Sequence, residues 1–404
     1  MKVLIVNKFH YLKGGSEKYY FDLAKLLMDK GHEVAFFSMQ NEKNIKTKCK
    51  EYFVKESDMN SKNIFKAFDV IYSKANKKEM EKALDDFRPD IVHLNNFQRQ
   101  LSASIIKPIK KRKIPIVFTA HDLQAICPSM GMLDKEKELC EKCIGGKYIN
   151  CIKKKCIKNS ELKSILGAIE AKYYRNKHIY SEKINLIIAP SEYVKSKFIE
   201  DGLKESKVVV LHNFIETEKY KLEVENDGYA FYYGRLSREK GIYNLLEAFK
   251  SIKEKKLYIA GEGPEKENIE KYLIKNNLKD RVKLTGYLDT NKINEYVRKS
   301  SFVVIPSICR ENCPYSVLET FAIGKPVIGS KLGGIPETVI NEKNGYTYRN
   351  KQELENKMRL LFNNPELAKR LGNNAKKDAI EKFSKEVYYE ELMEIYKGVI
   401  ENGK

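Results

Sequence analysis

The chain has 404 residues, of which 42% are hydrophobic and 32% charged, and its formal net charge is +20 at pH 7. This length predicts two domains, each large enough for its own core, and the composition is ordinary for a soluble globular protein. No run of 18 apolar residues occurs, which argues against a membrane-spanning helix. The apolar start at 2–6 is too short for a signal peptide. We therefore expect a cytoplasmic protein.

In the first half, short runs of apolar, mostly β-branched residues alternate with amphipathic stretches. This alternation predicts a parallel sheet with crossover helices. The runs lie at 3–6, 34–37, 90–94, 114–120, 186–190 and 208–213.

The same cycle restarts after a polar segment at 216–228, with runs at 229–236, 257–263, 282–287, 302–307 and 326–330. A last helix is expected from residue 385 to 400, with apolar residues at Val387, Leu392, Ile395 and Val399. The expected fold class is therefore α/β with two Rossmann-like domains. We expect the first domain to span 1–218, the second 219–384 and the C-terminal helix 385–404.

Two carboxylates and two cations in the second half form the most informative constellation. Glu311 and Glu319 bracket a segment that begins a helix, and Arg235 and Lys240 lie upstream in GRLSREKG. Arg can bind phosphate oxygens through two parallel hydrogen bonds, and Lys adds a mobile charge. Carboxylates do not bind phosphate, so sugar hydroxyls are their natural partners. The set predicts a site for a diphosphate joined to a polyhydroxylated group.

The expected helix after Glu311 adds a second anion-binding element. Pro314 fits its first turn, and Gly324 fits its stop. Free backbone N–H groups at 313–317 would then point at a bound anion.

Several motifs follow one another in the order of a known family. The second half carries GRLSREKG, GEGP at 261–264, the E-x7-E pair and GSKLGGIPE at 329–337. The first half carries PDIVHLNN at 89–96, IVFTAHD at 116–122, IIAPSEYVK at 187–195 and VVVLHNFIE at 208–216. Over nearly its whole length the chain resembles the retaining glycosyltransferases of family 4, which have the two-Rossmann glycosyltransferase-B (GT-B) fold.

This resemblance implies two domains facing across a cleft, with the C-terminal helix crossing back to the first. It implies transfer of a sugar, with retention, from a nucleotide-diphosphate sugar to a hydroxyl of a glycan or lipid-linked acceptor in cell-surface polysaccharide synthesis. Asp-x-Asp is absent from the sequence, so we expect catalysis without a metal or other cofactor. Arg235 and Lys240 would neutralise the departing diphosphate instead.

The resemblance also assigns residues. Catalysis would use His121, which stands in the T-x-H-D segment, together with Glu311, Arg235 and Lys240. The acceptor cleft would contain His93, Asn95 and Asn96, although relatives often carry another His where the two Asn stand. The wider donor site would comprise Gly14, Gly15, Arg235, Lys240, Gly263, Glu311, Asn312, Cys313, Pro314, Tyr315, Ser316 and Glu319. The alternatives are a plain glycine turn at Gly14–Gly15 and ordinary hydrogen-bonding histidines at the strand ends.

Cysteines are concentrated in an insertion at about 127–156. Cys140, Cys143, Cys151 and Cys156 could form a small tetrathiolate site for a structural zinc. A disulfide framework is not expected in the cytoplasm, and the other interpretation is a loop of reduced thiols.

Basic residues cluster at 107–113 and 153–158. One interpretation is a solvated surface, and the other is contact with anionic lipid at the inner face of the cell membrane. The sequence contains no recognisable nucleic-acid-binding motif, so nucleic acid is not an expected partner.

Two other functions compete with sugar transfer. A nucleotide-sugar epimerase or phosphorylase on the same fold would also bind phosphate and sugar, but E-x7-E together with GRLSREKG favours transfer. A basic, non-enzymatic nucleic-acid-binding or membrane-binding protein is the remaining alternative.

Overall fold

A computed structural model describes residues 1–55, 69–136, 138–220 and 225–402, so residue 137 of the cysteine-rich insertion lies outside the described part. The chain forms two compact units. Unit 1 contains Met1–His212 and Tyr389–Lys404, and unit 2 contains Asn213–Tyr388. The predicted divisions, after 218 and after 384, lie six residues later and four residues earlier than these, respectively.

Unit 1 is built on seven parallel strands in the order β3-β2-β1-β4-β5-β6-β7. Val3 of β1 pairs with Val34 of β2 on one side and with Ile91 of β4 on the other. The strands are β1 (Lys2–Val6), β2 (Glu33–Met39), β3 (Lys50–Val54), β4 (Ile91–Leu94), β5 (Ile116–Thr119), β6 (Leu186–Ala189) and β7 (Val208–Val210). This sheet confirms the predicted α/β class for the first half.

Serine side chains begin three of the helices in unit 1. Ser73, Ser160 and Ser191 each accept a hydrogen bond from the backbone N–H three residues later, which satisfies an otherwise unpaired donor. The helices are α1 (Gly15–Asp29), α3 (Lys74–Phe87), α4 (Ile106–Lys111), α5 (Ile149–Lys153), α6 (Glu161–Asn176), α7 (Glu192–Glu200) and the C-terminal part of α15 (Lys385–Asn402).

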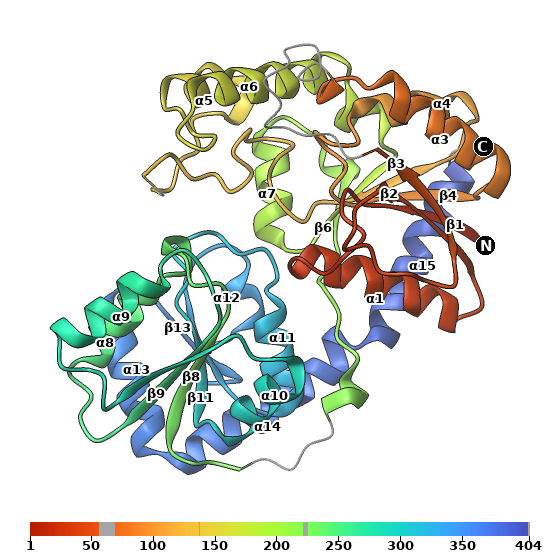
Figure 1. The fold of residues 1–404 in the computed structure, drawn as a ribbon. Helices are drawn as coiled ribbons and strands as arrows, with labels where there is room; N and C mark the ends of the chain where they lie inside the picture. Colours follow the sequence, from red (N-terminus) through yellow and green to blue (C-terminus); the bar gives the residue numbers. More distant parts are fainter. Residues whose placement is uncertain (56–68, 137, 221–224, 403–404) are drawn as a thin grey trace. The chain divides into compact units, whose positions relative to one another are not determined.

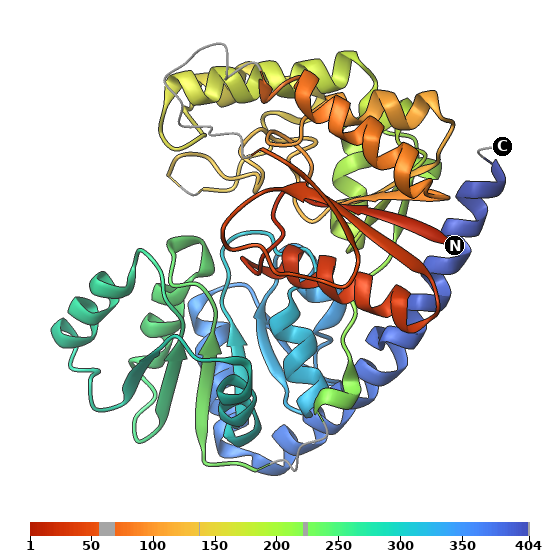
Figure 2. The same ribbon diagram turned by 45° about the vertical axis from the view of Figure 1, so that its right-hand side comes forward.

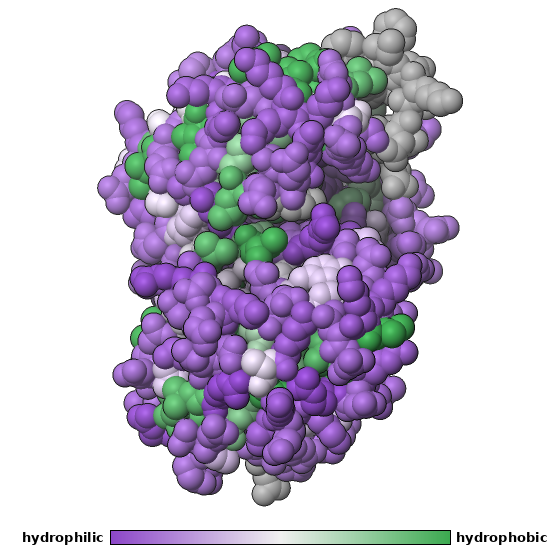
Figure 3. All heavy atoms as spheres, turned by 90° about the vertical axis from the view of Figure 1, so that its left-hand side faces the viewer, coloured by the Kyte–Doolittle hydropathy of each residue, from purple (hydrophilic) through white to green (hydrophobic). Residues whose placement is uncertain are grey.

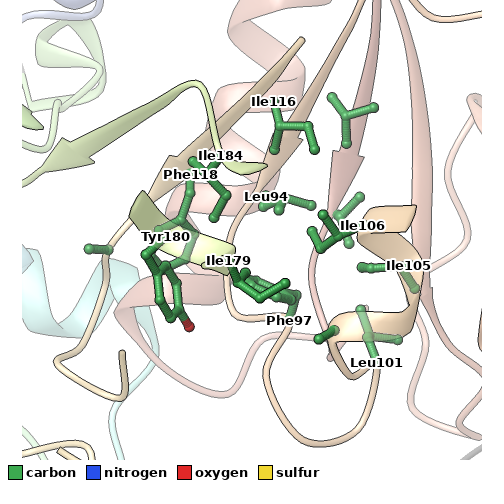
Figure 4. Close-up of a cluster of buried hydrophobic side chains, with 14 of the residues drawn as sticks. Leu94, Phe97, Leu101, Ile105, Ile106, Ile116, Phe118, Ile179, Tyr180 and Ile184 are labelled. Atoms are coloured by element: carbon green, nitrogen blue, oxygen red, sulfur yellow. The ribbon is translucent and has the colours of Figure 1, made fainter. Parts of the chain in front are cut away.

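The core of unit 1 includes apolar side chains from β4 and β5 and from the segments after them (Figure 4). Leu94, Phe97 and Phe118 are almost completely buried. The rings of Phe97 and Phe118 lie edge to face at 5.6 Å, a favoured aromatic geometry. This packing holds the carboxyl ends of β4 and β5 in place.

Unit 2 has six parallel strands in the order β10-β9-β8-β11-β12-β13. The strands are β8 (Tyr229–Tyr233), β9 (Lys256–Ala260), β10 (Val282–Gly286), β11 (Phe302–Ile305), β12 (Val327–Ser330) and β13 (Gly345–Tyr348). Helices α8 (Ile242–Phe249) and α13 (Lys351–Asn363) lie on one side of this sheet, and α10 (Thr290–Lys299) and α11 (Tyr315–Ile323) on the other (Figure 1). The remaining helices are α9 (Lys266–Lys275), α12 (Ile335–Thr338) and α14 (Pro365–Phe383).

Helix α11 begins and ends close to the predicted positions. Pro314 is the residue before the first helical turn rather than part of it, with an extended ψ of 128°. Gly324 ends the helix with φ 91°, a left-handed conformation that glycine adopts without a Cβ penalty. The predicted stop is therefore confirmed.

The end of α15 packs on the sheet of unit 1, close to the N-terminus of the chain (Figures 1 and 2). The Tyr396 hydroxyl lies 2.5 Å from Nδ1 of His93 on β4. The buried face of α15 includes Tyr388, Leu392, Met393, Tyr396 and Val399. The predicted positions Leu392 and Val399 are thus buried, whereas Val387 and Ile395 are only half-buried.

Hydrophilic side chains dominate the face drawn in Figure 3, and apolar side chains appear there in small separate groups. Among the described residues, no helix combines the length and the apolar composition needed to cross a bilayer.

Candidate functional site

In both sheets the strand order reverses next to the first strand of the unit. The reversal falls between β1 and β4 in unit 1 and between β8 and β11 in unit 2. Ligands of such sheets bind outside the carboxyl ends of the strands at this switch point. In unit 2, Arg235 and Lys240 follow β8, and Ser307 and Glu311 follow β11.

Lys240 and Glu311 form a close ion pair at the switch point of unit 2. Lys240 Nζ lies 2.6 Å from Glu311 Oε1, and the Ser307 hydroxyl donates to the same oxygen at 2.7 Å. The two charged side chains are 31% and 16% exposed. Lys240 and Glu311 are 71 residues apart in the sequence, and the fold makes their side chains direct neighbours.

Their electrostatics keep both groups charged. Burial acts to raise the pKa of Glu311, but the charge and hydrogen bond of Lys240, with help from Ser307, hold it below the usual value. Burial acts to lower the pKa of Lys240, but Glu311 raises it above the usual value. The pair is thus ionised across the neutral pH range.

Glycines let the loops around this pair approach one another. Gly241 has φ 68°, and a Cβ there would lie 1.8 Å from the Pro306 carbonyl oxygen. A Cβ on Gly263 would lie 2.2 Å from the carbonyl oxygen of Leu236. Both contacts require glycine, so Gly263 supports the loop that carries Arg235 and Lys240.

Arg235 and Glu319 lie on either side of this arrangement in the sequence. The Arg235 side chain is exposed and forms no ion pair among the described residues. Glu319 is half-buried on α11, and its Oε2 accepts from the Tyr233 hydroxyl at 3.3 Å. Tyr233 also donates to the Ser316 carbonyl at 2.9 Å, which ties the end of β8 to the first turn of α11.

The start of α11 presents the predicted run Asn312–Ser316. No side chain caps this helix, and of the predicted N–H groups at 313–317 that of Val317 donates to the Pro314 carbonyl at 3.0 Å. The Asn213 amide donates to the Cys313 carbonyl at 2.8 Å and fixes the approach to the helix.

In unit 1 the predicted glycines lie at the start of α1. Gly15 is the first helical residue, and Gly14 precedes it in an extended conformation with φ −173°. Both are exposed, and a Cβ on Gly14 would make only an ordinary contact at 3.8 Å with Glu17. The backbone conformation at Gly14 therefore does not require glycine.

His121 and Asn95 come together at the ends of β5 and β4. His121 Nε2 lies 2.9 Å from the Asn95 side-chain oxygen, so this nitrogen carries the proton and donates. Burial lowers the pKa of His121 to about 3, which makes the imidazole neutral. Asn96 is also buried, and its backbone N–H donates to Asn7 at 3.1 Å.

His93 does not fit the role of a cleft residue in this structure. Its side chain is fully buried, and its two nitrogens lie 2.5 Å from the Tyr396 hydroxyl and 2.7 Å from the Thr119 hydroxyl. Burial, with His121 nearby, lowers its pKa to about 3. His93 thus connects the sheet to α15, a contact that spans 303 residues and that sequence reasoning missed.

Several thiols of the cysteine-rich insertion lie close enough to influence one another. Cys143 interacts with Cys127, which lowers the pKa of Cys127 to about 6. Burial and neighbouring Cys156 raise the pKa of Cys151 to about 12. No set of three or more His, Cys, Asp or Glu side chains in the described ranges is placed to hold a metal ion. The zinc site stays a prediction.

Sequence reasoning also missed two residues of the unit 2 site. Ser307 orients Glu311, and Tyr233 holds Glu319. Both stand at strand ends, Ser307 two residues past β11 and Tyr233 as the last residue of β8. Their position at the switch point was a signal that could have identified them.

Comparison with solved structures is consistent with the architecture. Sucrose-phosphate synthase from Thermosynechococcus elongatus aligns over 99% of both chains with a TM-score of 0.75 at 19% identity. Anabaena HepE, solved in complex with UDP-glucose, aligns over 98% of this chain and 100% of its own with a TM-score of 0.70 at 17% identity.

Curated relatives match over part of the chain. An uncharacterized glycosyltransferase of Methanocaldococcus jannaschii is 32% identical over 51% of this chain and 56% of its own length. The capsular polysaccharide biosynthesis glycosyltransferase CapM of Staphylococcus aureus is 30% identical over 52% of this chain and 60% of its own. The match thus spans less than two thirds of either relative.

Two family profiles together match most of the chain. The profile described as Glycosyltransferase Family 4 matches residues 13–219, which is about half of the chain. The profile described as Glycosyl transferases group 1 matches residues 214–378. The chain therefore belongs to the glycosyltransferases that these two profiles describe, and its two parallel α/β units form the GT-B fold.

Proposed function

We propose that the protein transfers a sugar from a nucleotide-diphosphate sugar to a hydroxyl of a glycan or lipid-linked acceptor. The observation that carries this proposal is the Lys240–Glu311 pair, 2.6 Å apart at the switch point of unit 2. In such a donor the β-phosphate is bonded directly to the sugar. Groups that bind the phosphate and the sugar hydroxyls must therefore be neighbours, and a cation beside a carboxylate meets that requirement.

The roles of the charged residues follow from the chemistry of the departing diphosphate. Arg235 and Lys240 stabilise the negative charge that develops as the bond from sugar to phosphate breaks. Glu311 accepts hydrogen bonds from sugar hydroxyls, and Glu319 from ribose hydroxyls. The N–H groups at the start of α11 and the loop that contains Gly263 complete the donor site.

On the acceptor side, His121 contributes a neutral imidazole held by Asn95. With its proton on Nε2, the neutral ring can accept a hydrogen bond from a sugar hydroxyl at Nδ1, and it does not oppose the positive charge that develops on the anomeric carbon of the sugar. Gly14 and Gly15 belong to the donor site instead, because an exposed glycine backbone permits close approach of the diphosphate. Asn95 and Asn96 supply amide groups nearby.

Two features of the relatives support the substrate class. HepE, which shares the fold, has been solved with UDP-glucose, and CapM is described as an enzyme of capsular polysaccharide biosynthesis. On the basis of these two proteins, we propose that this protein also uses a nucleotide-sugar donor and also acts in polysaccharide synthesis. Retention of the anomeric configuration, metal-independent catalysis and membership of family 4 in the narrower sense are part of the same proposal.

The last part of the proposal concerns the membrane. We propose that unit 1 makes peripheral contact with an anionic membrane surface at the inner face of the cell membrane. Of the cluster at 107–113, Arg112 pairs with Asp85, whereas Lys107, Lys110, Lys111 and Lys113 form no ion pair among the described residues. Each cation near such a surface contributes about 1 kcal/mol. Salt-sensitive sedimentation with anionic but not neutral vesicles tests this part.

The transfer proposal is tested by a panel of nucleotide sugars. We expect one donor to raise the melting temperature, because ligand binding to the native state stabilises it. We expect the same donor to release its nucleotide diphosphate when acceptor is supplied, and NMR of the product to show the donor's anomeric configuration. A panel that neither stabilises the protein nor yields nucleotide would refute transfer, and an inverted product would refute retention alone.

A further inference from the structure

Unit 1 contains a cavity of about 580 Å³ that the transfer proposal does not use. It lies between α4, the end of α6 and the turn before β6, and its volume is in the range of ordinary small-molecule sites. Its lining includes Ile106 and Ile179, which belong to the buried core of the unit (Figure 4). None of the residues proposed to bind the donor or the acceptor lines it.

Four lysines line this cavity, whereas no aspartate or glutamate does. Lys107 and Lys110 lie one turn apart on α4, Lys177 follows the end of α6, and Lys183 ends the turn Ile179–Lys183. None of the four forms an ion pair or a side-chain hydrogen bond among the described residues. The fold thus brings four unpaired cations from two distant segments of the sequence to one cavity.

These cations lie close enough to repel one another. Lys183 is half-buried, and burial lowers its pKa, to which the charges of Lys177 and Lys107 add. The charge of Glu182 opposes this effect, but Glu182 is exposed, does not line the cavity and lies 3.5 Å from Nδ1 of His178. Repulsion between cations costs free energy, and an anion in the cavity would offset it.

Two tyrosines add neutral hydrogen-bond donors to the lining. Tyr72 lies just before α3 and Tyr173 in the last turn of α6, and both are half-buried. Their rings are 6.5 Å apart in an edge-to-face arrangement, and neither hydroxyl forms a hydrogen bond among the described residues. Burial raises the pKa of Tyr173, so its hydroxyl keeps its proton and can donate. The charged and polar side chains of the lining therefore offer donors but no carboxylate.

We propose that this cavity binds a ligand that carries two or more negative charges on phosphate groups. Phosphate oxygens are strong hydrogen-bond acceptors, and lysine binds them as a point charge. A single negative charge would leave most of the repulsion among the four lysines in place. Soluble phosphate compounds and lipid headgroups share this chemistry, and the two sources are separated by experiment. The proposal does not rest on sugar transfer.

Diffuse attraction between a basic protein and any anion is the competing explanation. Lys111 and Lys113 belong to the same basic cluster as Lys107 and Lys110, and they are exposed but do not line the cavity. Diffuse attraction depends on the number of cations, whereas a defined site depends on the cations that line it. Lys111 and Lys113 therefore provide a control of equal charge.

The test measures binding of pyrophosphate by isothermal titration calorimetry. Every protein is full-length and carries Arg235→Gln/Lys240→Gln, so that the proposed donor site does not contribute. Four proteins are compared: this background alone, and the background with Lys177→Gln/Lys183→Gln, with Lys111→Gln/Lys113→Gln or with Lys253→Gln. Lys253 is an exposed cation of unit 2 that forms no ion pair among the described residues. None of the substituted unit 1 lysines has a partner to lose, so we expect unchanged melting temperatures, which are measured alongside.

We expect pyrophosphate to bind the background and both controls alike, and to bind the Lys177→Gln/Lys183→Gln protein about tenfold more weakly or worse, because two charge-assisted contacts are lost. Sedimentation with phosphatidylcholine vesicles, with and without phosphatidic acid, identifies the source. A selective loss of binding to the acidic vesicles in the Lys177→Gln/Lys183→Gln protein would assign a lipid headgroup. A selective loss with pyrophosphate alone would assign a soluble phosphate compound.

The proposal is overturned if neither probe loses binding selectively in the Lys177→Gln/Lys183→Gln protein. That result includes absence of binding and an equal loss in the Lys111→Gln/Lys113→Gln control, which would indicate diffuse attraction. Because the donor site is removed from every protein compared, the outcome leaves the transfer proposal untouched.

Discussion

The two units share one topology but carry different chemistry at their strand ends. In unit 2 the switch point holds the half-buried ion pair Lys240–Glu311, and each partner maintains the charge of the other. In unit 1, His93 lies on β4 beside the switch point and His121 follows the next strand, β5, and burial keeps both imidazoles neutral. The same backbone arrangement thus supports a charged site in one unit and a neutral pair of imidazoles in the other.

This difference shows that fold and site are specified separately. The parallel sheets arise from apolar runs that alternate with helices, and those runs are similar in both units. The chemistry resides in the few residues just past the strands. A diphosphate requires cations, whereas an uncharged hydroxyl acceptor is bound by neutral hydrogen-bonding groups, so the comparison matches the proposed division between donor and acceptor.

The largest effect is expected from breaking the ion pair. Lys240→Ala and Glu311→Ala should each reduce kcat/KM by roughly two orders of magnitude, or about 3 kcal/mol of transition-state stabilisation, because each removes a preorganised charge. Steady-state assays with the donor selected from the panel measure this effect. Lys253→Ala serves as the matched control and should retain activity. Wild-type turnover in a folded Lys240→Ala protein would contradict the assignment.

A smaller effect is expected from adding a methyl group to the glycine loops of the two units. Gly241→Ala should reduce the free energy of unfolding by about 2 kcal/mol or more, because its φ of 68° is strained for alanine and its Cβ would collide with Pro306. Gly14→Ala, in unit 1, should stay within about 0.5 kcal/mol of wild type, because its backbone is extended and its Cβ is unobstructed. Denaturant unfolding of both variants tests this contrast. Equal losses of unfolding free energy in the two variants would show that glycine is no more necessary at position 241 than at position 14.

The neutral histidines of unit 1 predict a pH dependence of stability. The pKa of His93 is about 3 in the folded state and about 6.5 as the ordinary value. The contribution of the neutral His93 to the free energy of unfolding is therefore complete above pH 6.5. It declines as the pH falls toward 3, by about 1.4 kcal/mol per pH unit. The free energy of unfolding of His93→Gln should consequently fall less steeply between pH 6.5 and 5 than that of wild type. Parallel slopes would mean that His93 titrates normally in the folded protein.

The smallest effect is expected from metal removal. Turnover should be unchanged by a chelator, because Arg235 and Lys240 supply the positive charge that a metal ion would otherwise provide. Elemental analysis of the purified protein measures the predicted structural zinc independently. Loss of turnover with a chelator that leaves the bound zinc in place, restored by magnesium, would contradict metal-independent catalysis.

Much of the fold could be predicted because buried parallel strands are nearly continuous apolar runs. The two strands that were missed, β3 and β13, lie at sheet edges. β3 reads KEYFV and is mostly half-exposed, and β13 begins with a glycine. Edge strands are paired on one side only and tolerate polar residues, so their sequences carry a weak hydrophobic signal.

The site could be predicted only as a set of residue types. The presence of Lys240 and Glu311 was readable from the motifs, but their direct contact depends on the loop approach at Gly241 and Pro306. His93 was assigned to a cleft because it ends a strand, yet its surroundings are decided by Tyr396 of α15. Contacts between segments this far apart in the chain leave no local pattern in the sequence.

The central claim is that the charged switch point of unit 2 binds a diphosphate. Calorimetric titration with a nucleoside and with its diphosphate, using the base selected by the donor panel, tests it most directly. We expect the diphosphate to bind wild type and Lys253→Gln about 100-fold more tightly than the nucleoside. We expect this advantage to fall below about tenfold in Arg235→Gln/Lys240→Gln, because two charge-assisted contacts are lost. An undiminished advantage in the folded double variant would contradict the account.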